Sequence, residues 1–131
     1  MRGLGNDARY WAALSEGRLS LPRCGGCGKW SWPAPYRCGD CGSWDFDWQD
    51  VALEGEVYSW TRVHHPFGGA EDLGLPYVTA SIALPQAGGI RLFGVLEDEA
   101  QAKIGLKVVG SVRTTKAFDR DVPALSWRVS A

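Results

Sequence analysis

Apolar residues near the start of the chain recur at helical spacing. Tyr10, Trp11 and Leu14 lie on one face of the segment 7–17, which is the period of an amphipathic helix. The expected boundaries are an N-cap at Asn6 or Asp7 and a stop at Gly17. We therefore predict one short helix within residues 1–20.

The apolar pattern changes to a period of two after residue 54. Apolar and polar residues alternate along 55–63 and 77–84, and further runs rich in β-branched residues cover 90–96, 108–115 and 125–129. Each run is bounded by glycine, proline or polar residues, and 98–103 has the composition of one helical turn.

Five short sequential strands suit a small closed barrel, because closure removes the exposed edges of an open sheet. The predicted fold class is mainly β: a short N-terminal helix, a metal-binding ribbon over 21–45, and a five-stranded barrel of the oligonucleotide/oligosaccharide-binding (OB) type over 46–131. An SH3-like barrel is the nearest competitor. The break 64–75 is the longest between strands, and loops of that length are more often functional than idle.

The ribbon is predicted from the cysteines. Cys24 and Cys27, and then Cys38 and Cys41, form two copies of Cys-x-x-Cys-Gly. Each copy can form a tight turn with two thiolates on one side, and four thiolates complete a tetrahedron with no open position. We expect one structural Zn²⁺. The alternatives are iron, two redox-active dithiols or two disulfides.

Composition limits the compartment and the partners. The chain has 131 residues with a formal net charge of −1, and it has no apolar run of about 18 residues and no signal-peptide pattern at its start. We expect a cytoplasmic protein with no membrane contact, where reduced thiols favour metal ligation over disulfides. Basic residues gather in 18–37 and acidic residues in 38–57, and the acidic run argues against binding to nucleic acid.

Few other residues could carry chemistry. His64 and His65 are the only histidines; a proton carrier is one interpretation, and contact with a partner is the one we favour. Trp30 and Trp32 lie between the cysteine pairs and could form an interface or cover the metal site. Arg37, with its neighbours in the basic run, could meet the phosphates of coenzyme A or balance the charge of the thiolates.

Taken in order, these motifs resemble a known family of proteins with an N-terminal helix, a rubredoxin-like zinc ribbon and a C-terminal OB-fold, long filed as a domain of unknown function and often found beside thiolases. The motifs that carry the resemblance are Tyr10-Trp11-Ala12-Ala13-Leu14, Leu21-Pro22-Arg23-Cys24, Cys38-x-x-Cys41-Gly42-Ser43, Gly55-x-Val57-Tyr58-Ser59-Trp60-Thr61, Pro76-Tyr77-Val78 and Ile104-Gly105-Leu106-Lys107-Val108. The match extends from about residue 10 to residue 127.

The resemblance implies a non-catalytic subunit of a thiolase-like enzyme that acts on acyl-CoA thioesters by acyl transfer, thiolysis or retro-aldol cleavage of steroid side chains. Longer versions fuse the unit to a hydratase-like domain, so we expect this chain to find its partner non-covalently. The alternatives are a stand-alone acyl-CoA-binding protein and a nucleic-acid-binding module, for which Tyr58, Trp60 and Arg62 would form a stacking face on one strand. The acyl group, the reaction, the stoichiometry and the barrel face that meets the partner are left open by these residues.

Overall fold

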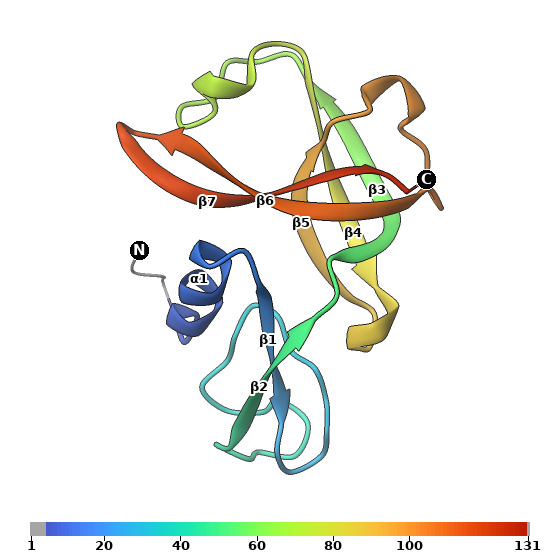
Figure 1. The fold of residues 1–131 in the computed structure, drawn as a ribbon. Helices are drawn as coiled ribbons and strands as arrows, with labels where there is room; N and C mark the ends of the chain where they lie inside the picture. The colour runs from blue at the N-terminus through green and yellow to red at the C-terminus, as the bar shows by residue number, and fades with distance from the viewer. Residues whose placement is uncertain (1–4, 131) are drawn as a thin grey trace. The chain divides into compact units, whose positions relative to one another are not determined.

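A computed structural model describes residues 5–130, and the chain divides into two units (Figure 1). The first unit comprises the residues up to Ala52 together with Leu84–Ile90, and the second comprises Leu53–Ala83 and the residues from Arg91 onward. Within residues 5–130, no helix has the length and apolar character needed to span a bilayer.

The predicted helix is α1, Ala8–Ser15, and its buried face includes Tyr10 and Leu14. Asp7 is the N-cap residue, but its carboxylate accepts a hydrogen bond from the indole N–H of Trp11 at 3.1 Å rather than capping the backbone. Gly17 adopts a φ of 80°, which a residue without Cβ tolerates. The helix therefore ends where the glycine predicted it would.

The first unit also contains a two-stranded sheet that the sequence pattern did not predict. Strand β1, Leu19–Cys24, pairs antiparallel with β2, Phe46–Val51. We expected the barrel to begin at residue 46, whereas residues 46–51 pair with β1 and the division between units follows Ala52. The antiparallel pairing also explains the segregated charges, because it brings the basic run beside the acidic run: Arg18 contacts Asp50 at 2.7 Å.

The second unit is a closed five-stranded barrel, as predicted. Its strands are β3, Glu54–Val63; β4, Tyr77–Leu84; β5, Ile90–Leu96; β6, Lys107–Ala117; and β7, Arg120–Val129. They close in the order β3-β4-β5-β7-β6, in which β5 and β7 are parallel. Single 3-10 turns interrupt the connections at Glu71–Leu73, Pro85–Ala87 and Glu99–Gln101, and the last lies within the predicted turn 98–103.

The barrel interior is organised around Trp127, whose side chain is completely buried. A Cβ on Gly94 of β5 would lie 2.5 Å from its indole nitrogen, and a Cβ on Gly110 of β6 would lie 2.8 Å from its six-membered ring. The indole therefore occupies space that exists only because both positions lack side chains.

One end of the barrel is formed by the β6–β7 hairpin and the long loop before β4. The hairpin turns at Phe118 and Asp119, which both have positive φ, as a two-residue turn of type I′ requires. The ring of Phe118 lies against Gly69, since a Cβ there would meet it at 3.0 Å, and the backbone N–H of Lys116 donates to the carboxylate of Asp72 at 2.7 Å. The long loop is therefore held against the hairpin tip.

Candidate metal centre

The four cysteines lie on two turns with the same backbone hydrogen bonds. In the first turn, the N–H of Gly28 donates to the carbonyl of Cys24 at 2.9 Å, and in the second the N–H of Gly42 donates to the carbonyl of Cys38 at 3.0 Å. Gly28 and Gly42 have φ values of 77° and 79°, which favour glycine. The repeated Cys-x-x-Cys-Gly motif thus produces two equivalent knuckles.

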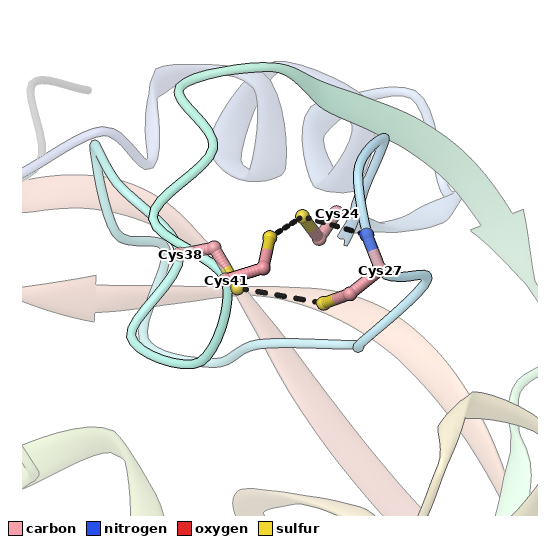
Figure 2. A group of neighbouring side chains, drawn as sticks. All are labelled: Cys24, Cys27, Cys38 and Cys41. Carbon is pink, nitrogen blue, oxygen red and sulfur yellow. Dashed lines mark hydrogen bonds between the residues drawn. The ribbon is translucent and has the colours of Figure 1, made fainter.

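The knuckles bring all four sulfur atoms together (Figure 2), within 4.8 Å of one another. The Sγ atoms of Cys24 and Cys41 are 3.5 Å apart, and those of Cys27 and Cys38 are 3.7 Å apart. A tetrahedral zinc ion with Zn–S bonds of about 2.3 Å requires sulfur separations of about 3.8 Å, whereas a disulfide requires about 2 Å. The donor set therefore fits a tetrahedral metal ion, and the four cysteines are free thiols rather than disulfides.

Backbone amides prepare part of this cluster for negative charge. The backbone N–H of Cys27, helped by that of Gly26, lowers the pKa of the Cys24 thiol. The backbone N–H groups of Cys41 and Asp40 lower the pKa of Cys38 in the same way. Since a thiol must lose its proton to bind a metal, these amides favour the ligand form.

Each knuckle is also bound to an arginine that precedes it. The Nε–H of Arg23 donates to the carbonyl of Gly28 at 2.8 Å, and the Nε–H of Arg37 donates to the carbonyl of Gly42 at 2.9 Å. Each guanidinium group is thus held on the turn that carries one pair of cysteines, where a positive charge is complementary to thiolates. This contact gives Arg37 a structural role that does not depend on a phosphate ligand.

The two knuckles are joined by an ion pair. The ammonium of Lys29 in the first lies 2.9 Å from the carboxylate of Asp40 in the second, and this contact raises the pKa of Lys29. Two glycines allow the chains to approach: a Cβ on Gly25 would lie 2.6 Å from the carboxylate of Asp45, and one on Gly26 would lie 3.1 Å from the sulfur of Cys41.

Trp30 and Trp32, the two tryptophans proposed from the sequence as an interface or a cover for the metal site, pack within the first unit. The Trp30 ring centroid lies 5.5 Å from the guanidinium of Arg23, and the ring also contacts Gly88, where a Cβ would be 3.0 Å away. Trp32 packs on Tyr10 of α1, with ring centroids 4.3 Å apart. Contact of Trp30 and Trp32 with a partner stays a prediction.

The two histidines lie apart from the cysteines in sequence and belong to the loop at the barrel end. His64 and His65 are both exposed, and the ring of His65 lies edge-on to Phe67 at 4.6 Å. Among residues 5–130, no carboxylate forms an ion pair with either imidazole. The same loop borders a hollow of about 320 Å³ lined mainly by apolar side chains and including Tyr77. A partner contact for the histidines stays a prediction.

The stacking face expected on β3 does not form. Val57 pairs with Ile82, but Ser59 already pairs with Ser81, so the strand has a β-bulge at Tyr58. Beyond the bulge, Trp60 and Arg62 are opposite Ala80 and Val78, which face the core, and Tyr58 instead lies under the guanidinium of Arg91 at 4.4 Å. The prediction of one shared face was wrong because an extra residue inverts the alternation of a strand.

Sequence reasoning also missed Trp44. Its side chain is 72% exposed, and its ring centroid lies 5.6 Å from the guanidinium of Arg37. The signal was present, because the repeat is longer than Cys-x-x-Cys-Gly: residues 23–30 and 37–44 share the pattern Arg-Cys-Gly-x-Cys-Gly-x-Trp.

The ribbon and the barrel together define a zinc-ribbon and OB-fold protein, and comparison with known families agrees. The model of the ChsH2 rubredoxin-like zinc ribbon domain matches residues 11–47, and that of the ChsH2 C-terminal OB-fold domain matches residues 48–113. The chain belongs to the ChsH2 family.

Solved structures and a curated relative extend the comparison. The solved "Ltp2-ChsH2(DUF35) aldolase" contains a chain that is 30% identical, with a TM-score of 0.80, over 99% of this chain and 100% of that one. A DUF35 protein of unknown function from Sulfolobus solfataricus is 19% identical over 93% and 83% of the two chains, with a TM-score of 0.58, and supports the fold. The curated "Probable enoyl-CoA hydratase alpha subunit" of Thermomonospora curvata is 33% identical over 109 residues, which cover 81% of this chain and one third of the relative's length.

Proposed function

We propose that this protein is a non-catalytic cytoplasmic subunit of an acyl-CoA enzyme of the aldolase type, in which it assembles with a thiolase-like partner and helps to shape the acyl-CoA site. The observation that carries the proposal is the full-length similarity to a chain of the Ltp2-ChsH2(DUF35) aldolase. The relative from Thermomonospora curvata, whose printed name refers to enoyl-CoA, supports the same class of substrate.

The side chains of residues 5–130 support an accessory role. All four cysteines lie in one cluster, so none is set apart as a nucleophile. The two histidines are exposed and, within the described chain, have no acidic partner that would orient them as a general base. The reacting groups are therefore expected to come from the partner subunit.

The metal is proposed to be a structural Zn²⁺ held by Cys24, Cys27, Cys38 and Cys41. Four thiolates complete its coordination sphere, so no position is left for a substrate. When bound, the ion supplies folding free energy to a segment with few core residues of its own. Its function is then to fix the two knuckles and the surface they present.

The proposal is tested by co-expressing the chain with a thiolase-like subunit encoded beside its gene. Size-exclusion chromatography with light scattering measures the mass of the complex, and elemental analysis of the same peak measures zinc. We expect a defined hetero-oligomer with about one zinc per copy of this chain, and acyl-CoA cleavage that requires both subunits. Separate peaks from two folded proteins would refute the pairing.

The competing interpretations predict different results with the isolated protein. A stand-alone acyl-CoA carrier would bind acyl-CoA in isothermal titration without a partner. A nucleic-acid-binding module would bind single-stranded oligonucleotide with an affinity that falls steeply with salt. Under the subunit proposal, the isolated chain shows neither property at the affinity that the complex has for acyl-CoA.

A further inference from the structure

The two metal-binding knuckles have the same backbone turn and the same arginine–tryptophan pair, but within residues 5–130 only one of the two tryptophans is covered. Each knuckle pairs an arginine with a tryptophan seven residues later: Arg23 with Trp30, and Arg37 with Trp44. Trp30 is half-buried, whereas Trp44 is 72% exposed. The difference arises from what packs on the indole, because the backbone of the two turns is the same.

The covered copy shows what such a surface accepts. The connection Leu84–Ile90 belongs to the first unit, and its glycine turn lies on Trp30. A Cβ on Gly88 would be 3.0 Å from Cδ1 of the indole, and Gly88 has a φ of 65°. A left-handed glycine therefore brings its backbone close to the ring, where a side chain would be crowded against the indole.

The open copy offers the same indole, with an exposed arginine beside it. Arg37 donates its Nε–H to Gly42, and among residues 5–130 no carboxylate forms an ion pair with its guanidinium. The exposed Tyr36 lies next to it in sequence. Exposed tryptophan and arginine are the residue types that most often dominate the energy of protein interfaces, and an exposed guanidinium is complementary to an acidic group.

We propose that Trp44 and Arg37 form the docking site for a turn of the partner subunit, and that this turn presents a left-handed glycine to the indole and a carboxylate to the guanidinium. This inference rests on the proposed function, because it names the surface through which that subunit binds. The glycine turn is inferred from the occupied copy at Trp30, and the carboxylate from charge complementarity.

The test uses the full-length chain labelled with fluorotryptophan, together with the co-expressed thiolase-like subunit. Trp44→Ala identifies the Trp44 fluorine resonance by its loss. On formation of the complex, that resonance should shift and lose its sensitivity to exchange of H2O for D2O. The resonance of Trp127, which is completely buried in the barrel, is the internal control and should not change.

The same variants measure the energetic weight of the contact. Trp44→Ala should raise the Kd for the partner about 10- to 100-fold, and Trp44→Phe, which keeps an aromatic face, should raise it less. Zinc content and melting temperature should match the wild type, since an exposed side chain contributes little to folding. These controls separate docking from a structural role in the ribbon.

The outcomes separate this inference from the proposed function. The docking site is refuted if the wild-type complex forms without a change in the Trp44 resonance and Trp44→Ala leaves the Kd for the partner unchanged. The proposed function would then still stand. The absence of any complex with the wild type refutes both. If the Trp44 resonance shifts when coenzyme A alone is added and does not shift with the partner, this surface binds a nucleotide. The proposal that it binds a turn of the partner subunit would then be refuted.

Discussion

The position of Gly94 against Trp127 leads to a stability prediction whose sign depends on the structure. A Cβ at residue 94 would lie 2.5 Å from the indole nitrogen, 2.6 Å from Cδ1 and 2.9 Å from the carbonyl oxygen of Leu125. Ordinary contacts between such atoms are about 3.5–4.0 Å. Gly94→Ala therefore creates an overlap of about 1 Å inside a close-packed core.

The expected magnitude follows from two opposing effects. Gly94 is not among the residues with positive φ, so alanine costs no backbone strain and by itself would stabilise a strand by about 0.5–1 kcal/mol. Overpacking of a core costs about 1–3 kcal/mol. We expect a net loss of about 1–2 kcal/mol in the free energy of unfolding, or roughly 4–16 °C in Tm for a domain of this size.

Urea unfolding followed by circular dichroism measures this loss in a double-mutant cycle with Trp127→Phe. The indole N–H has no hydrogen-bond partner within the described chain, so the phenylalanine removes bulk without breaking a bond. Gly94→Ala should cost clearly less in the Trp127→Phe background. Gly68→Ala, where the nearest atom would be 3.4 Å away, is the control and should be nearly neutral. A Gly94→Ala protein at least as stable as the wild type would refute the packing described for Trp127.

Three further predictions concern the first unit. Cys38→Ser should reduce bound zinc from about one ion per chain to nearly none in elemental analysis, because three thiolates no longer complete the tetrahedron; retention of one tightly bound zinc would contradict the ligand set. Burial, with a contribution from Asp7, raises the pKa of Tyr10 to about 12, so the associated stability is present below about pH 10 and is lost as pH rises through 12. Alkaline urea titrations should show this loss, on the order of 2–3 kcal/mol, in the wild type and not in Tyr10→Phe. Asp40→Asn removes an exposed ion pair with Lys29 and should lower the free energy of unfolding by less than about 1 kcal/mol, with zinc content unchanged.

Periodicity was sufficient to predict the helix and the barrel strands because each has a pattern set by its own residues. The strands 77–84 and 90–96 have the predicted bounds, since alternation and flanking breakers act locally. The hairpin β6–β7 extends further than predicted on both sides of its turn. Asp119 is a common turn residue, but Phe118 is not, and the contacts of Phe118 and Lys116 with the long loop hold the turn in place.

The β1–β2 sheet and the bulge in β3 were not predicted from the sequence, because both depend on pairing with residues distant along the chain. Strand β1 contains Pro22, a residue that argues against a strand in a sequence pattern. Its partner β2 lies beyond the cysteines, so the pairing is not visible in either segment alone. The bulge at Tyr58 arises from the register between β3 and β4. The sequence of one strand does not show which of its residues will be left unpaired by the neighbouring strand.

The sequence by itself determined the two knuckles, their glycines and the mainly β class, because metal-ligand spacing and backbone permissiveness are local properties. Only the tertiary structure decided which of the two equivalent tryptophans is covered. The glycine turn 84–90, more than fifty residues away in the chain, packs on Trp30 and leaves Trp44 exposed. Burial is a property of the packed chain, so two copies of one motif can have the same backbone and different surfaces.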